Sequence, residues 1–206
     1  MNLNQFLPTA AAEYRTLLAA AFAMAEEAGN IHMRYFRSSN LEQSTKLNDS
    51  DVVTVADKEA EAAILNYIHR HFPTHGVISE ETGREHDDRE WRWVVDPLDG
   101  TTNFAMGLPA FCVSIALEHN REAVLGVVFA PYLGECFCAV RGGGAWLNGT
   151  PIHCSDKAEM SKAVVATGMP YDRNDNPDNN LAEICRMALC VRGIRRMGSA
   201  AIDLCY

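Results

Sequence analysis

The stretch Asp96-Pro97-Leu98-Asp99-Gly100-Thr101-Thr102-Asn103-Phe104 directly follows the apolar run Trp93-Val94-Val95. The apolar run predicts a buried strand, and two carboxylates leave its end on either side of a Pro-Leu pair. Together with the Leu98 carbonyl, these carboxylates can hold one hard cation such as Mg²⁺, which prefers a few carboxylates and retained water. If the Gly100–Thr102 turn opens a helix, its backbone N–H groups offer an anion site beside that cation. The stretch therefore suggests phosphate chemistry.

The same stretch could be an ordinary turn, because Asp, Pro and Gly all favour turns. Two further acidic points count against that alternative. The apolar run Gly76–Ser79 ends at Glu80-Glu81, and Asp57 begins a strongly helical segment. Alone, the two glutamates could be a solvated loop and Asp57 a first-turn residue that suits the helix dipole. Because ligands gather at strand ends in α/β folds, the three points together predict one shared site.

Hydrophobic spacing along the rest of the chain predicts an α+β fold in which two helices precede a sheet. The helices are expected over 9–36 and 55–72, and Pro73 ends the second. Strands are expected over Gly76–Ser79, Arg92–Val95, Ala110–Glu118, Ala123–Ala130 and Glu135–Val140. Turn residues separate the last three, which predicts an antiparallel meander. A hairpin-like link over 142–149, a strand over 163–167, a loop over 172–180 and a helix over 181–191 follow.

Length and composition indicate one soluble domain with a real core. The chain has 206 residues, of which 48% are hydrophobic and 22% charged. No apolar run approaches the ~20 residues that span a bilayer, and Met1–Gln5 lacks the basic region of a signal peptide. The net charge of −9 argues against a nucleic-acid surface. Seven cysteines without a C-x-x-C pair disfavour zinc and fit a reducing, cytoplasmic location.

Several segments carry a resemblance to a known family. They are D-V-V-T-V-A-D at 51–57, P-T-H-G-V-I-S-E-E at 73–81, W-V-V-D-P-L-D-G-T-T-N-F at 93–104, G-L-P-A-F-C-V-S-I-A-L at 107–117, G-G-G-A-W-L-N-G at 142–149 and R-R-M-G-S-A-A-I-D-L at 195–204. In content, order and spacing they resemble the inositol monophosphatase-like family of magnesium-dependent, lithium-sensitive phosphatases. The T-N-F ending is most similar to the inositol-1-monophosphatase branch. The resemblance implies a layered α/β/α/β/α sandwich with a first sub-domain at about 1–143 and a partial second one at about 144–206.

The resemblance also implies an activity, a cofactor and a homodimer. The activity is hydrolysis of a small phosphate monoester, an inositol monophosphate or a related polyol or sugar phosphate, with two or three Mg²⁺ ions per site. Glu80, Asp96 and the Leu98 carbonyl would bind one ion, and Asp96 would bridge to a second ion that Asp99 also holds. Thr101, paired with Asp57, would orient and help deprotonate the attacking water; Glu80 counts as catalytic, and Glu81 is a further candidate. The implied substrate-binding residues are Gly100, Thr101, Thr102, Gly198, Ser199 and Ala200. No nucleic-acid or membrane partner is expected.

The sequence departs from the family pattern at two points. Ser79 stands where the family more often has Gly before the paired glutamates. The chain also stops at Tyr206, before the family's W-D-x-A-A-G segment, whose Asp completes the second metal site. We therefore expect a phosphatase-type domain truncated at its C-terminus. The alternative is a catalytically impaired, non-enzymatic interaction protein on the same fold. A haloacid-dehalogenase-like D-x-D-G-T site is disfavoured, because that motif has one residue between its aspartates and this chain has two.

Overall fold

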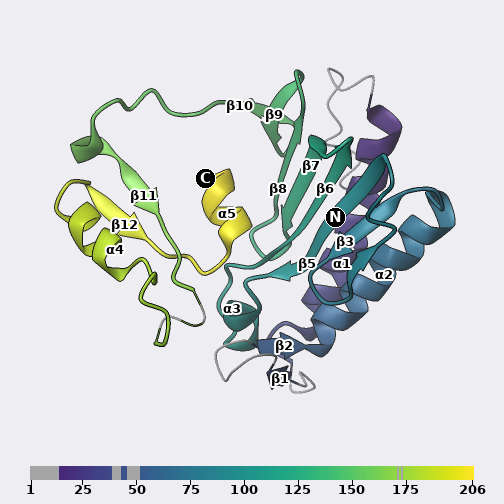
Figure 1. The fold of residues 1–206 in the computed structure, drawn as a ribbon, viewed down its shortest axis with the longest axis horizontal. Helices are drawn as coiled ribbons and strands as arrows, with labels where there is room; N and C mark the ends of the chain where they lie inside the picture. The colour runs from purple at the N-terminus through teal and green to yellow at the C-terminus, as the bar shows by residue number, and fades with distance from the viewer. Residues whose placement is uncertain (1–13, 39–42, 46–51, 171, 173) are drawn as a thin grey trace.

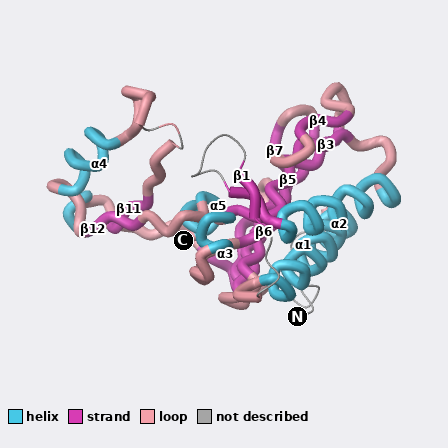
Figure 2. The backbone as a smooth tube through the Cα atoms, turned by 90° about the horizontal axis from the view of Figure 1, so that it is seen from below, coloured by secondary structure: helices cyan, strands magenta, loops and turns pink. Residues whose placement is uncertain are grey.

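The computed structural model describes residues 14–38, 43–45, 52–170, 172 and 174–206. The expected helix start at 9–13, Asp51 and the segment Met1–Gln5 lie outside these residues. Five layers follow one another across the molecule (Figure 1, Figure 2). They are the helices α1 (Arg15–Tyr35) and α2 (Val55–His71), an eight-stranded sheet, the helix α5 (Ala200–Cys205), a parallel pair of β11 (Val164–Ala166) and β12 (Gly193–Arg195), and the helix α4 (Leu181–Ala188). The predicted α/β/α/β/α order is confirmed, with a small second half.

The large sheet has the strand order β10-β9-β8-β7-β6-β5-β3-β4. Its strands are β3 (Gly76–Ser79), β4 (Gly83–Glu85), β5 (Trp91–Asp99), β6 (Cys112–His119), β7 (Glu122–Ala130), β8 (Glu135–Val140), β9 (Gly144–Leu147) and β10 (Thr150–Ile152). Only β3 and β5 pair in parallel within this sheet. The predicted meander of β6, β7 and β8 is confirmed. Because β9 and β10 join it, the sheet continues to Ile152, past the residue 143 at which the sequence analysis divides the chain.

Four short elements complete the described part of the chain. The strands β1 (Gln43–Thr45) and β2 (Val52–Thr54) pair with each other, and β2 runs directly into α2. The helix α3 (Thr101–Ala105) follows β5, and a 3₁₀ turn, η3 (Met160–Lys162), precedes β11. None of the described helices is both long and apolar enough to cross a bilayer.

The helices α1 and α2 pack on one face of the large sheet and form the main core with it. Phe22 and Met24 of α1 and Trp93 and Ile115 of the sheet are fully or almost fully buried there. Gly29 is required at the closest approach of α1 to β7, because a Cβ at this position would lie 2.4 Å from Cε1 of Phe129. The helix α5 packs on the opposite face, where Ile202 meets Cys112 and Ala130.

The hairpin between β9 and β10 turns at Asn148-Gly149, both of which have positive φ (49° and 78°). A two-residue turn of this kind needs positive φ at both positions, which Asn-Gly supplies. The Asn148 side chain is anchored as well. Its Oδ1 accepts from the Cys136 N–H at 2.8 Å, and its Nδ2 donates to the Gly134 carbonyl at 3.0 Å. The turn is thereby tied to the neighbouring β7–β8 turn.

Two predicted boundaries were wrong. The strand expected at Arg92–Val95 is β5, which runs from Trp91 through Asp99, so the two aspartates lie inside the strand. Pairing with β6 shifts register between Asp96, opposite Ser114, and Asp99, opposite Cys112. Since Pro97 lacks the N–H that a regular ladder requires, the strand bulges there instead of ending. The helix α4 ends at Ala188 rather than at 191.

Candidate active site

Asp57 and Thr101 meet at the start of α2. Thr54 and Asp57 form a capping box, in which Asp57 Oδ2 accepts from the Thr54 N–H at 2.7 Å and from the Thr54 hydroxyl at 2.6 Å. The other oxygen, Oδ1, accepts from the Thr101 hydroxyl at 3.1 Å. Asp57 is buried, and this burial raises the pKa of its carboxyl even though the hydrogen bonds from Thr54 and Thr101 oppose the shift. The structure thus brings together the pair that the sequence analysis joins.

Asp96 lies beside the carboxyl of Glu80 and within the influence of the charge of Asp99. Glu80 follows β3, the parallel neighbour of β5, and its N–H donates to the Val95 carbonyl at 3.2 Å. Burial, the negative charges of Glu80 and Asp99, and a hydrogen bond with Glu80 together raise the pKa of Asp96 to about 9. The Leu98 N–H, which donates to Asp96 Oδ1 at 3.2 Å, opposes this shift. Like charges held this close require either a proton or a cation between them.

Asp99 links the motif to the segment before α5. Its Oδ2 accepts from the Ser199 hydroxyl at 2.7 Å and from the Ala201 N–H at 2.6 Å. Ser199 in turn caps α5 by accepting from the Ile202 N–H. The predicted substrate-side residues Gly198, Ser199 and Ala200 therefore lie beside Asp99, although they are about a hundred positions away in the sequence.

The turn after β5 requires glycine. Gly100 has φ +92°, and a Cβ there would lie 2.8 Å from the Ala110 carbonyl oxygen. Asn103, three residues later in α3, donates through Nδ2 to the Ala110 carbonyl at 2.7 Å and to the Met197 carbonyl at 2.6 Å. The sequence analysis did not assign Asn103 a role, although the T-N-F ending of the motif contains it. Asn103 ties α3 to the segment that carries Gly198.

Glu61 supports the loop that carries Glu80 and Glu81. It lies buried on α2 and accepts through Oε1 from the Ser79 hydroxyl at 2.5 Å and from the Thr82 N–H at 2.9 Å. These contacts bracket the two glutamates on both sides. Ser79, the departure from the family pattern, therefore contributes a hydroxyl that Gly would lack. Glu61 was not predicted from the sequence, because its position on the helix resembles that of a solvated surface residue.

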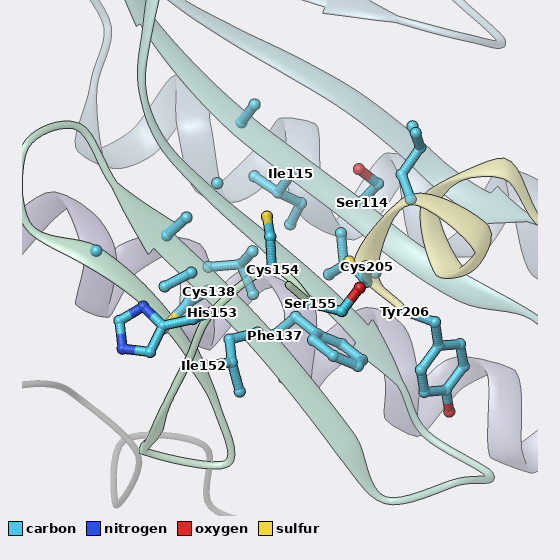
Figure 3. Close-up of a pocket in the computed structure, with 18 residues that line it drawn as sticks. Ser114, Ile115, Phe137, Cys138, Ile152, His153, Cys154, Ser155, Cys205 and Tyr206 are labelled. Carbon is cyan, nitrogen blue, oxygen red and sulfur yellow. The ribbon is translucent and has the colours of Figure 1, made fainter. Parts of the chain in front are cut away.

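Two cavities lie near these residues. One, of about 390 Å³, is lined by Asp99 and Gly198–Ala200 on one side and by Thr167 and Arg196 on another. A larger one, of about 740 Å³, lies on the β6–β9 face beside the end of α5 and is lined by Phe137, Cys138 and Tyr206 (Figure 3). The larger cavity contains none of the predicted site residues. The smaller cavity, which has Asp99 and Gly198–Ala200 in its lining, is therefore the candidate substrate pocket.

The donor set fits a hard cation. Glu80, Asp96 and the Leu98 carbonyl are oxygen ligands, as Mg²⁺ prefers, and a cation would relieve the repulsion that raises the pKa of Asp96. In the described part of the chain, no group of three or more His, Cys, Asp or Glu side chains has metal-binding spacing. The first predicted ion needs only two such side chains and a carbonyl. Asp99, which a second ion would use, directs Oδ2 to α5.

The five-layer fold, with carboxylates at the ends of β3 and β5, places the protein among the layered α+β proteins with an acidic site at the strand ends. A model of the inositol monophosphatase family matches residues 13–206, and the chain belongs to that family. It is 39% identical over 191 residues to the Nus factor SuhB of Haemophilus influenzae, covering 92% of this chain and 72% of that one. It is 46% identical over 155 residues to the inositol-1-monophosphatase of Synechocystis sp., covering 75% and 54% respectively. The solved structure of inositol monophosphatase from Anabaena (Nostoc) sp. superposes with a TM-score of 0.83 at 42% identity, over 93% of this chain and 70% of that one.

Proposed function

We propose that this protein hydrolyses a small phosphate monoester, an inositol monophosphate or a related polyol or sugar phosphate, in a Mg²⁺-dependent reaction. The observation that carries the proposal is the position of the Thr101 hydroxyl. It lies 3.1 Å from Asp57 Oδ1 and 2.9 Å from the carbonyl oxygen of Leu98, whose N–H donates to Asp96 Oδ1. A hydroxyl between a buried base and a candidate metal ligand is well placed to orient the water that attacks phosphorus.

Thr101 and Asp57 form a short path for a proton. A hydroxyl has one hydrogen, so when Thr101 donates it to Asp57 its lone pairs remain free to accept from water. Burial raises the pKa of Asp57, which makes its carboxylate a stronger base than an exposed aspartate. The attacking water can therefore lose its proton toward Asp57 through Thr101, and the capping box keeps Asp57 fixed meanwhile.

The remaining site residues bind the cofactor and the substrate. Glu80, Asp96 and the Leu98 carbonyl would hold one Mg²⁺, and Asp96 with the free oxygen of Asp99 a second. When bound, Mg²⁺ supplies charge neutralisation at the phosphate and lowers the pKa of water. The substrate contacts that we propose are the N–H groups of Gly100, Thr101 and Thr102 for the phosphate, and Gly198, Ser199 and Ala200 for the polyol. Because the protein has a net charge of −9, an anionic substrate needs such local compensation.

The test is phosphate release from a panel that includes myo-inositol 1-phosphate, with and without Mg²⁺. We expect activity only with Mg²⁺ and a loss of at least about a hundredfold in Asp96→Asn, which keeps the side-chain shape and removes the charge. Asp88→Asn is the control, since Asp88 is exposed and lies outside the site. Phosphate release by Asp96→Asn at the wild-type rate, or release that does not depend on Mg²⁺, would contradict the proposal.

A second candidate function is that of a non-enzymatic interaction protein on the same fold. The observation that favours it is the name of several relatives, Nus factor SuhB, at 36–39% identity. If the folded wild-type protein releases no phosphate from any member of the panel, this candidate replaces the first. We also infer a homodimer and a cytoplasmic location, with no nucleic-acid partner. Light scattering, cell fractionation and a filter-binding assay with RNA test these three inferences.

A further inference from the structure

His32 lies inside the protein directly against the Asp96–Asp99 motif. Its side chain is fully buried on α1, and Nε2 is 2.9 Å from the Pro97 carbonyl oxygen. A carbonyl can only accept, so Nε2 carries the hydrogen of this bond. The rings of Phe104 and Phe111 face the imidazole edge-on, each at a centroid distance of 6.0 Å. Burial lowers the pKa of His32 to about 4, so the ring is neutral at neutral pH.

An imidazole is a costly side chain for this position. Its second nitrogen, Nδ1, is buried and has no hydrogen-bond partner among the residues that the structure describes. A buried polar atom without a partner destabilises the folded state, whereas an apolar side chain of similar size would fill the same space without that cost. The hydrogen bond to Pro97 is the contact that an apolar side chain could not make.

The Pro97 carbonyl belongs to the bulged part of β5. Asp96 is opposite Ser114 and Asp99 is opposite Cys112, so three steps along β5 match two along β6. Backbone groups within such a bulge leave the regular ladder and need other partners. His32 supplies the partner for Pro97 from a helix that is 65 positions away in sequence.

The bond reaches Asp96 through one peptide unit. The Pro97 C=O and the Leu98 N–H belong to the same planar group, so they point in opposite directions and rotate together. On one side His32 donates to the carbonyl at 2.9 Å. On the other side the Leu98 N–H donates to Asp96 Oδ1 at 3.2 Å. Any rotation that breaks the first bond also misaligns the second.

We propose that His32 is a positioning residue that fixes the Pro97–Leu98 peptide unit and, through it, the carboxylate of Asp96. The N–H at Nε2 holds the peptide unit in place, and the rest of the ring only fills space in the core. The link to catalysis rests on the proposed function, since it takes Asp96 to be a metal ligand. The link between His32 and the conformation of the motif is independent of the proposed function.

The test compares donor-free variants, His32→Leu and His32→Met, with His32→Gln, whose amide can place a donor near Nε2. Hydrogen exchange measured by mass spectrometry follows the peptide that spans 96–105, and calorimetry follows Mg²⁺ binding. In the donor-free variants we expect exchange in 96–105 to rise about tenfold, as loss of one hydrogen bond implies. Mg²⁺ affinity should fall by at least about tenfold, as for other residues that orient metal ligands. His32→Gln should restore both to within about threefold of wild type.

Phe22→Leu is the matched control, because it creates a core defect on the same helix without touching Pro97. It should lower the melting temperature and leave exchange in 96–105 and Mg²⁺ affinity unchanged. Wild-type exchange in both donor-free variants would overturn the proposal. So would a His32→Gln variant as impaired as His32→Leu, because packing would then explain the effect. If the wild-type protein binds no Mg²⁺, the proposed function fails, and the exchange data still decide the role of His32.

Discussion

At the scale of single residues, Thr101 has two acceptors within reach and only one proton to give, which makes it the most sensitive point of the site. Replacing it with Ala removes the hydroxyl between Asp57 and Leu98 without touching Glu80 or Asp96. We expect turnover to fall about 10²–10⁴-fold, the usual contribution of a positioned proton acceptor. The Mg²⁺ concentration for half-maximal activity should stay within about threefold of wild type. Steady-state kinetics at several Mg²⁺ concentrations measure both quantities.

Two variants control this prediction. Thr101→Ser keeps the hydroxyl and should retain most of the turnover. Thr102→Ala alters the exposed neighbouring side chain and leaves the backbone N–H in place. If Thr101→Ala turns over at the wild-type rate, Thr101 does not orient the attacking water.

His32 gives a prediction about pH and stability. Its pKa of about 4 in the folded protein lies below the ordinary value of 6.5, so the unfolded chain binds more protons between these two values. Stability is therefore fully present above pH 6.5 and is lost as the pH falls toward 4, by about 3 kcal/mol across the window. His32→Leu should remove this part of the pH dependence. Urea unfolding of wild type and of His32→Leu at pH 7.5 and 4.5 measures the free energy of unfolding of each protein. An equal loss of stability between the two pH values in both proteins would contradict the prediction.

The residues of the candidate site can be picked out from the sequence, whereas the residues that support them cannot. Asp57, Asp96, Asp99 and Thr101 occur in short runs whose chemistry is visible without a fold. His32, by contrast, acts on the motif across 65 positions. On a helix such a residue has the spacing of an ordinary core or surface position, and only tertiary packing shows which carbonyl it meets.

At the scale of elements, the meander was predictable because turn residues separate three runs of strand-forming residues. The extent of β5 was not. Its last four residues, Asp96–Asp99, contain two charges and a proline, which disfavour a regular strand, and a bulge in the pairing with β6 accommodates them. Of the β11–β12 pair, only β11 was predicted. Each strand has three residues, which is too short a pattern to show a period.

The contact between α1 and β7 gives a prediction at this scale. In an open helix, Gly→Ala stabilises by up to about 1 kcal/mol. At Gly29 the same substitution should destabilise the protein, because the new methyl would overlap Phe129. Overpacking of this kind costs about 1–3 kcal/mol. Gly168→Ala is the control, since no heavy atom lies within 4 Å of a Cβ there. Thermal unfolding of the two variants should show a clear loss of stability for Gly29→Ala only, and a stabilised Gly29→Ala would show that α1 shifts to accommodate the methyl.

At the scale of the whole molecule, the two halves meet at the site. The layer order follows from the family resemblance, because the short strands and helices of the second half carry little signal of their own. What joins the halves is a small set of side chains that includes Asp99 and Asn103, which hold the segment before α5 against β5 and α3. The candidate pocket therefore depends on the relative placement of both halves.

Asn103→Ala tests this dependence. It removes the donor shared by the Ala110 and Met197 carbonyls and should release the neighbouring residues Gly198–Ala200, which line the pocket. We expect KM to rise about tenfold, as loss of about 1.4 kcal/mol of substrate binding implies, with a smaller change in kcat. Asn176→Ala, which removes two exposed local hydrogen bonds, one to Asp172 and one from the Asp178 N–H, is the control. An unchanged KM would mean that the segment is held by Asp99 alone.

The Asn148-Gly149 turn has a consequence for the chemical ageing of the protein. Asn-Gly pairs lose ammonia when the glycine nitrogen attacks the asparagine side chain, and this attack requires the side chain to swing toward its own backbone. Here both ends of the amide are held, one by the Cys136 N–H in β8 and the other by the Gly134 carbonyl in the β7–β8 turn. Deamidation should therefore be slow in the folded protein and fast once the hairpin opens. The new carboxylate would then face the Gly134 carbonyl, two acceptors without a hydrogen between them, so the altered turn would resist closing again.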